Sequence, residues 1–149
     1  MGITGRNLEK STVALISKNN IIDGNGGDEV TFITSPRQAA QVLEVGVTIT
    51  KDAGASIAGQ SDWEVKVYDK NNESGVTIAT CTFAATAVAG DEKTTRDSSM
   101  TFASGYTNAS DRVFAKGARI VMHQSTTTGS GNDIFAPYVI AIPFGAEPA

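Results

Sequence analysis

Hydrophobic and polar side chains alternate along several stretches of this chain with the two-residue period of a β-strand. The clearest stretch is 42–50, where one face is expected to carry Leu43, Val45, Val47 and Ile49 and the opposite face Glu44, Gly46, Thr48 and Thr50. Residues 62–69 repeat the alternation, and the turn-rich segment 69–75 leads into a further strand from Val76 to about Ala84. We therefore expect an antiparallel pair of Trp63–Tyr68 with Val76–Phe83.

Weaker patterns predict the remaining strands at 12–16, 21–22, 29–33, 118–124 and 135–144, with a short edge strand at 100–102. In 118–124, Ile120 and Met122 are expected to point inwards. The last strand is expected to carry on one face Tyr138, Ile140, Ile142 and Phe144. Pro137 and Pro143 interrupt this strand, and because proline has no N–H to donate, they predict that it lies at the edge of a sheet.

Helix signals are nearly absent. At most one helical turn is expected, at 36–43, and the segment 90–99, which has no apolar period, is expected to be a long exposed loop. About seven to nine short strands without intervening helices predict an all-β fold, an antiparallel β-sandwich that resembles a jelly roll. The sandwich is expected to span 12–145, with an N-terminal arm at 1–11 and a loose C-terminal tail at 146–149.

The composition agrees with a single β domain and argues against several classes of partner. Of the 149 residues, 40% are hydrophobic and only 19% are charged. A net charge of −4 without any run of basic residues argues against a protein that binds nucleic acid. No apolar stretch reaches the roughly 20 residues that span a bilayer, so no membrane partner is expected. A single cysteine and an N-terminus without the pattern of a secretion signal indicate folding in a cytosol.

No motif in the chain specifies a reaction, a metal or a cofactor. His123 is the single histidine, and its strand position on the face of Arg119 and Val121 is typical of a surface or packing residue. Cys81, in the middle of a strand, is expected to be a buried thiol, and these two residues are too few to bind zinc. The segment 23–29 begins like a calcium loop but lacks the later ligands, which favours a tight turn. The sequence therefore predicts that the protein is not an enzyme and has no catalytic residue, cofactor or metal.

The segment 113–122 has the pattern apolar-x-Gly-x-x-apolar, which opens a late strand in jelly-roll modules. A loop rich in Ser, Thr and Gly follows it, and the final strand Tyr138–Phe144 ends at Gly145. The chain also has an arm at 1–11 and strands rich in Ala, Thr and Gly. In these features it resembles the decoration (cement) proteins of tailed bacteriophage capsids. The resemblance covers residues 12–145 in outline.

This resemblance implies a structural virion protein that is made in the host cytoplasm, binds the outer capsid surface and stabilises contacts between shell subunits. Its partners would be the major capsid protein and further copies of itself, as a homodimer or homotrimer. Arg6 and Lys10 in the arm are then candidates for contacts with a neighbour. Phe83, Pro137 and Cys81 are candidates for an outward apolar patch.

A carbohydrate-binding module, or the receptor-binding tip of a phage fibre, is the alternative function. Such sites stack flat aromatic rings on sugar rings, and because Trp63 is expected in the core, Tyr68 and Tyr106 are the remaining candidates. An enzyme that works through carboxylates or hydroxyls is the third possibility. Asp62 and Glu64 share an outward strand face, which is the ordinary arrangement of solvated carboxylates.

Overall fold

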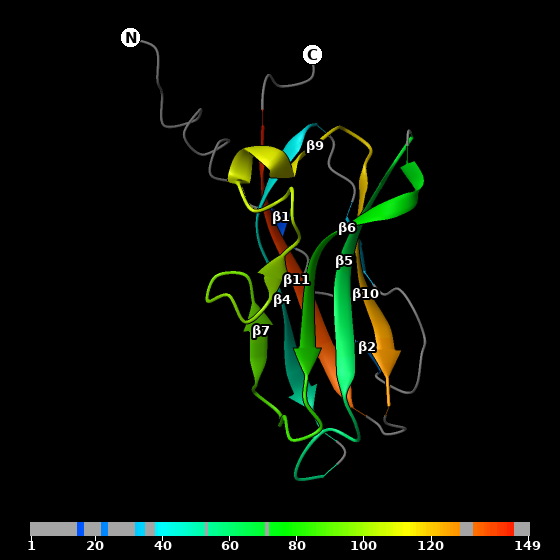
Figure 1. The fold of residues 1–149 in the computed structure, drawn as a ribbon, viewed down its shortest axis with the longest axis vertical. Helices are drawn as coiled ribbons and strands as arrows, with labels where there is room; N and C mark the ends of the chain where they lie inside the picture. The colour runs from blue at the N-terminus through cyan, green and yellow to red at the C-terminus, as the bar shows by residue number, and fades with distance from the viewer. Residues whose placement is uncertain are drawn as a thin grey trace.

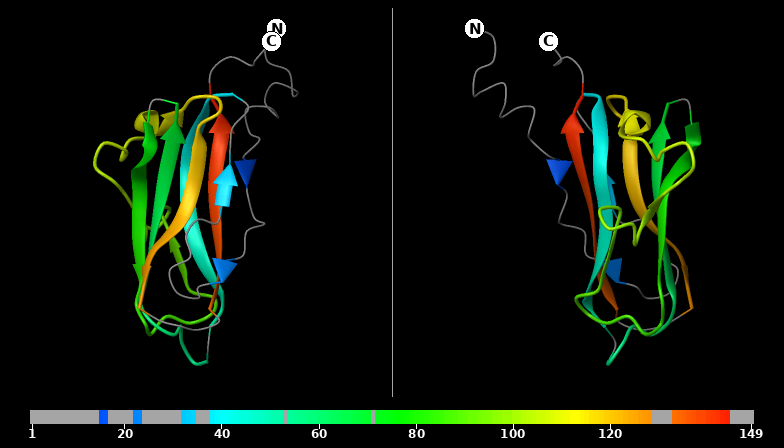
Figure 2. Two further views of the ribbon diagram at one scale, coloured as in Figure 1. Left: turned by 90° about the vertical axis from the view of Figure 1, so that its right-hand side faces the viewer. Right: turned by 60° about the vertical axis from the view of Figure 1, so that its left-hand side comes forward.

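Two antiparallel β-sheets packed face to face make up the described part of the chain (Figure 1, Figure 2). The computed structural model describes residues 15–16, 22–23, 32–34, 38–52, 54–70, 72–128 and 133–144. Sheet A contains β1 (Leu15–Ile16), β2 (Ile22–Asp23), β4 (Ala40–Lys51), β7 (Glu92–Thr94), β9 (Val113–Phe114) and β11 (Ile134–Pro143). Sheet B contains β3 (Phe32–Thr34), β5 (Ser61–Asp69), β6 (Asn72–Phe83), β8 (Thr101–Phe102) and β10 (Arg119–Thr127). A short 3-10 helix, η1 (Ala109–Arg112), precedes β9. The predicted all-β antiparallel sandwich is confirmed.

The strand pairing is nested, as in a jelly roll. The first strand β1 pairs with the last strand β11, and β3 pairs with β10. Inside these pairs, β4 pairs with β7 and β5 with β6, so the chain follows the course of one long hairpin. This hairpin is wrapped into two layers because β11 also pairs with β4, and β10 with β5. The resulting orders are β1-β11-β4-β7 in sheet A and β3-β10-β5-β6-β8 in sheet B.

The core lies between the two sheets and is built from the inward positions of the long strands. Three aromatic rings meet in it: Phe135 lies 5.1 Å from Trp63 and 5.7 Å from Phe83, measured between ring centroids. Ile120 and Met122 are 1% and 0% exposed, which confirms their predicted inward orientation. The predicted pair of strands 63–68 and 76–83 is present as β5 and β6. Trp63, at 1% exposure, is a core residue as expected.

Leu43 departs from the predicted alternation. Along the ladder between β11 and β4, Ile140 is opposite Glu44 and Ala141 is opposite Val42, so Leu43 is an extra residue at a β-bulge. Val42 and Val45 both point into the core, whereas Leu43 is 41% exposed. The prediction that Leu43 shares the inner face is therefore wrong, because the bulge shifts the alternation by one position.

β11 is an interior strand, which corrects the prediction that it lies at an edge. It has β4 on one side and the two short strands β1 and β2 on the other. The pairs on the β1 and β2 side involve Phe135 and Ile140 with their neighbours, so Pro137 falls between these two stretches of pairing. Pro137 belongs to the buried positions of β11, and Phe83 is 0% exposed. Neither residue points outwards, so the prediction of an outward apolar patch at these positions is wrong.

The segment 90–99 contains a strand that the sequence pattern did not indicate. Glu92–Thr94 forms β7 and pairs with Gly46–Thr48 of β4, so these residues are not part of an exposed loop. At the other end of β4, residues 40–43 belong to the strand rather than to a helical turn. The edge strand expected at 100–102 is present as β8 at the edge of sheet B.

Arg112 fills the gap that β7 and β9 leave along β4. Its Nε donates to the carbonyl of Val42 over 3.0 Å, and its Nη1 donates to the carbonyls of Tyr106 and Thr107 over 2.7 and 2.9 Å. The guanidinium lies 3.9 Å from the centroid of the Phe102 ring in sheet B. A side chain that is only 7% exposed thus connects the edges of both sheets.

The predicted N-terminal strands are described only in part. β1, β2 and β3 coincide with or overlap the stretches 12–16, 21–22 and 29–33, and the other residues of those stretches lie outside the described part of the chain. The arm at 1–11, with Arg6 and Lys10, and the tail at 146–149 also lie outside it. Among the residues that are described, no helix is long and apolar enough to cross a membrane.

Candidate interaction surface

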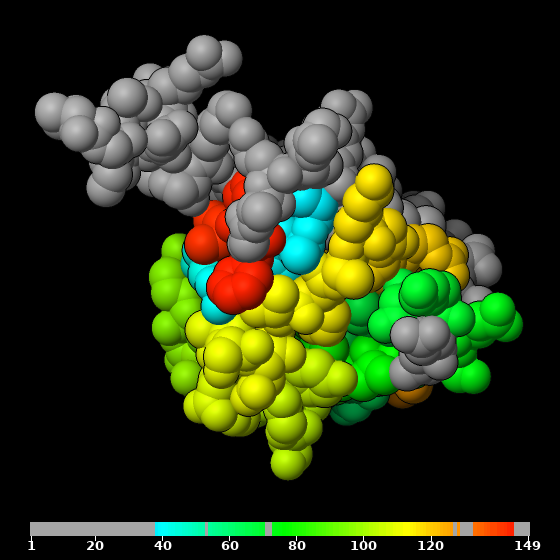
Figure 3. Space-filling view, turned by 90° about the horizontal axis from the view of Figure 1, so that it is seen from above, coloured from blue at the N-terminus to red at the C-terminus, as the bar shows by residue number. Residues whose placement is uncertain are grey.

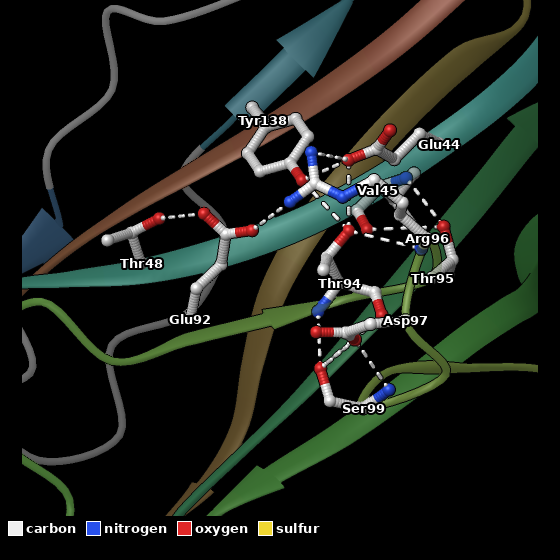
Figure 4. A network of polar contacts seen from close by, with 10 residues as sticks. All are labelled: Glu44, Val45, Thr48, Glu92, Thr94, Thr95, Arg96, Asp97, Ser99 and Tyr138. Carbon is white, nitrogen blue, oxygen red and sulfur yellow. Dashed lines mark hydrogen bonds and ion pairs between the residues drawn. The ribbon is translucent and has the colours of Figure 1, made fainter.

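The outer face of sheet A carries a hydrogen-bond network centred on Glu44 (Figure 4). The hydroxyl of Tyr138, on β11, donates to Glu44 Oε1 over 2.5 Å and lies 2.9 Å from Thr94 Oγ1. Thr94, on β7, donates from its own hydroxyl to the same Glu44 oxygen over 3.0 Å. Because Glu44 belongs to β4, the network joins all three neighbouring strands β11, β4 and β7.

Gly46 makes this network possible. It stands opposite Tyr138 in the ladder and opposite Thr94 on the other side. A Cβ atom at position 46 would lie 2.5 Å from Tyr138 Cε1, a distance that real Cβ contacts do not reach. Glycine therefore lets the tyrosine ring lie across β4 and reach a residue on β7.

The rim of the network is ionic and exposed. Arg96 is 66% exposed and pairs with Glu92 Oε1 over 3.0 Å and with Glu44 Oε1 over 3.7 Å. Thr48 donates to the other oxygen of Glu92 over 3.3 Å. Exposed pairs of this kind contribute little to stability, about 0–1 kcal/mol each. Their consequence is a surface on which opposite charges are already matched within the chain.

The loop that follows β7 is fixed by its own side chains. The backbone N–H of Thr94 donates to Ser99 Oγ over 2.9 Å, and Ser99 donates to Asp97 Oδ1 from both its N–H and its hydroxyl. These hydrogen bonds from Ser99 lower the pKa of Asp97. The backbone N–H of Val45 donates to Thr95 Oγ1 over 3.1 Å, which attaches the loop to β4.

The pKa of the Tyr138 hydroxyl is raised to about 12, first by burial and then by its hydrogen bond to the carboxylate of Glu44. At neutral pH the hydroxyl is therefore protonated and serves as a donor. The hydroxyl is engaged with Glu44 and Thr94, so the tyrosine links the neighbouring strands of sheet A.

Three apolar side chains stand where β11 ends and β4 begins, and we call Leu43, Ile142 and Phe144 the end patch. Leu43 and Phe144 are 41% and 47% exposed, and Ile142 is half-buried between them along the ladder. The backbone N–H of Phe144 donates to the carbonyl of Ala39, which holds the patch against β4. Figure 3 shows this end of the sandwich, with the end of β11 next to the start of β4.

The outer face of sheet B has a second network, centred on Glu64 of β5. Its carboxylate accepts a hydrogen bond from Thr77 over 3.0 Å, pairs with Lys66 over 3.3 Å and lies 2.7 Å from His123 Nδ1. Burial raises the pKa of Glu64, but the hydrogen bonds from Thr77, Lys66 and His123 outweigh it and lower the pKa overall. His123 is thus a packing residue on the face shared with Arg119, as its strand position indicated.

The cysteine and the two tyrosines that the sequence singled out are all in contact with other parts of the fold. Cys81 is 8% exposed, and burial raises the pKa of its thiol to about 12, so the buried-thiol expectation is confirmed and the outward one is wrong. Tyr68 lies 4.9 Å below the guanidinium of Arg119, and Tyr106 packs against Phe114. Both tyrosines already use ring surface within the chain, which weighs against a sugar platform. No group of three metal-binding side chains occurs among the described residues.

Sequence reasoning missed the role of Glu44 and Tyr138. The alternation placed Glu44 and Gly46 on the outer face correctly, and it placed Tyr138 on the face of Ile140 and Ile142. The signal that was available is the glycine itself, because a glycine in the interior of a regular strand indicates close approach by another group.

Comparison with known proteins gives the following results. No family model matches the chain, and no curated protein matches it. Among solved structures, the chain is similar to a chain in the structure of the infectious bursal disease virus Gx strain. The TM-score is 0.37 and the sequence identity 13%, over 93% of this chain and 33% of the other. The chain thus spans about a third of the length of that viral chain.

Proposed function

We propose that this protein is a structural virion component that binds the outside of an assembled phage capsid and stabilises contacts between shell subunits. The observation that carries the proposal is the outer face of sheet A. There the network around Glu44 joins β11, β4 and β7, and the exposed end patch lies where β11 ends and β4 begins. The sequence resemblance to decoration proteins supports the same proposal.

A protein that reinforces a shell gains most from a surface that is ordered before it binds, because immobilising side chains at an interface costs free energy. On this face the exposed side chain of Arg96 is already held by its ion pairs with Glu92 and Glu44. Leu43 and Phe144 supply the exposed apolar area that the centre of an interface needs. In this proposal the end patch contacts the major capsid protein, and the protein acts as a homodimer or homotrimer.

Purified capsids that lack this protein provide the test. The protein is mixed with the shells, unbound protein is removed by sedimentation, and bound copies are counted against the shell subunit. A saturating number in a simple ratio to the shell subunit is expected. The same ratio is expected in particles isolated from their source. A protein that stays in the supernatant, and is missing from particles, would overturn the proposal and favour glycan binding, which a glycan array then measures.

Variants separate the surface from the general fold. Leu43→Ser combined with Phe144→Ser removes the exposed apolar side chains of the end patch. The loss of their burial is expected to weaken binding to shells at least about tenfold. Val88→Ser is the matched control, because Val88 is 38% exposed and lies by the opposite end of β4, where its loop bonds to Ile49. Equal binding by the end-patch variant and the control would show that this surface does not face the shell.

A further inference from the structure

A polar layer lies between the sheets at the end where β5 and β11 begin. Trp63 of β5 contacts Phe135 of β11 in the core. The inward positions that precede these two residues are Ser61 on β5 and Asp133 just before β11. Gln124 of β10, opposite Trp63 in the ladder, directs its amide into this layer, since its Nε2 donates to Ser61 Oγ over 2.6 Å.

The layer is buried although it is polar. Ser61, Gln124 and Asp133 are 1%, 2% and 4% exposed. The carboxylate of Asp133 is held by one oxygen only, Oδ2, which accepts the backbone N–H of Ala58 over 2.9 Å. This hydrogen bond attaches Asp133 to the connection between β4 and β5, which contains Ala58.

Three buried polar atoms have no hydrogen-bond partner within the described part of the chain, and they belong to Gln124, to Asp133 and to Trp63, which is opposite Gln124 in the ladder. They are Trp63 Nε1, Gln124 Oε1 and Asp133 Oδ1. One atom is a donor and two are acceptors, and they come from the neighbouring strands β5 and β10 and from the start of β11. Buried polar atoms are nearly always hydrogen bonded, so these three atoms require a partner that the described residues do not supply.

We propose that this polar layer binds one internal water molecule, which donates to Gln124 Oε1 and Asp133 Oδ1 and accepts from the indole N–H of Trp63. A water molecule offers two donors and two acceptors, so it complements a set of one donor and two acceptors. A flip of the Gln124 amide would place its N–H donor where Oε1 stands. The water would then accept from Trp63 and Gln124 and donate to Asp133 Oδ1, so it would still match the set. A metal cation fits less well, because the indole N–H cannot bind it.

The chain offers a direct spectroscopic probe of this water, because Trp63 is its single tryptophan. In nuclear magnetic resonance spectra of the wild-type protein, a cross-peak is expected between the indole proton of Trp63 and a long-lived water molecule. Gln124→Leu removes one ligand and fills space with an apolar group, so the cross-peak should be lost. Gln60→Leu is the control, since the Gln60 side chain is exposed and hydrogen bonds to Asp62 at the surface. A wild-type spectrum without the cross-peak would overturn the proposal.

A high-resolution crystal structure of the wild-type protein tests the same inference without any variant. Density at hydrogen-bond distance, about 2.7–3.2 Å, from Gln124 Oε1 and Asp133 Oδ1 is the expected result. Density at about 2.3–2.6 Å from both oxygens would instead indicate a cation such as calcium, and so would a melting temperature that rises with calcium and falls with a chelator. Either of these outcomes would refute the water site.

Discussion

The ring of Tyr138 lies over the backbone of Gly46, its partner across the ladder of β11 and β4. This contact places the tyrosine hydroxyl within hydrogen-bond distance of Glu44 and Thr94. The hydrogen-bond network on the outer face of sheet A therefore depends on a residue that contributes no side chain to it.

Gly46→Ala is expected to destabilise the protein by about 1–3 kcal/mol, because the new methyl group would overlap the tyrosine ring and displace it from Glu44. Urea denaturation measures the effect. Gly54→Ala is the control, because a Cβ at Gly54 meets nothing within 4 Å. In a Tyr138→Ala background the cost of Gly46→Ala should largely disappear. Equal stability of the two alanine variants in the wild-type background would contradict this account.

Tyr138→Phe removes the hydroxyl and is expected to abolish a late step in the alkaline titration. The pKa of Tyr138 is raised to about 12 from an ordinary value of 10.0 by burial and by Glu44. A raised pKa in the folded state means that the stabilisation is complete below pH 10 and is lost as the pH rises towards 12. Absorbance of tyrosinate, followed with pH, should show the late step in the wild type only. A variant that keeps the late step would show that the step does not belong to Tyr138.

The alternation of side chains predicted the long strands because their inner faces obey a local rule. Ile120 and Met122 point inwards as a period of two requires, and the same rule identifies the strand around Trp63. The β-bulge at Leu43 could not be derived in this way, because an extra residue in one strand is defined only by the strand paired with it. Pro137 could not be placed either, since its position between two short stretches of pairing depends on β1 and β2.

The candidate surface was less predictable than the fold because its contacts join distant parts of the chain. Glu44 meets Thr94 and Tyr138, which follow it by 50 and 94 residues. β7 has three residues, Glu92–Thr94, without an apolar period, and it is a strand because β4 offers it an edge to pair with. Local patterns give no sign of such partners.

Arg112→Ala is expected to destabilise the protein by about 3 kcal/mol, because it leaves the carbonyls of Val42, Tyr106 and Thr107 without their charged donor. Burial lowers the pKa of Arg112 while Asp111 opposes the shift, yet a guanidinium stays charged at neutral pH. Arg112→Lys should recover only part of the loss, since lysine lacks the planar fork.

Chemical denaturation of both Arg112 variants provides the measurement, with Arg96→Ala as the control. Arg96 is 66% exposed, so its removal should cost less than about 1 kcal/mol. Similar losses for Arg96→Ala and Arg112→Ala would contradict the view that Arg112 connects the two sheets.

Glu64→Gln is expected to reduce stability at neutral pH and to have a smaller effect in acid. The pKa of Glu64 lies below its ordinary value of 4.5, because hydrogen bonds from Thr77, Lys66 and His123 outweigh the effect of burial. A lowered pKa in the folded state gives stabilisation that is present above pH 4.5 and is lost as the pH falls through the folded value. Urea midpoints of wild type and variant should therefore converge below pH 4.5. A constant difference between them would show that the charge of Glu64 is not responsible.

Cys81 is expected to resist alkylation in the folded protein. Burial raises the pKa of its thiol to about 12 from an ordinary 9.0, while Lys93 opposes the shift and Asp62 adds to it. Because the thiolate is the reactive species, iodoacetamide at pH 8 should leave the native protein unmodified and label it fully in urea, as mass spectrometry can measure. Lys93→Met removes the cation that favours the thiolate, so this variant should be no more reactive than the wild type. Fast labelling of the native wild type, at a rate independent of unfolding, would contradict this expectation. It would mean that the strand around Cys81 opens in solution.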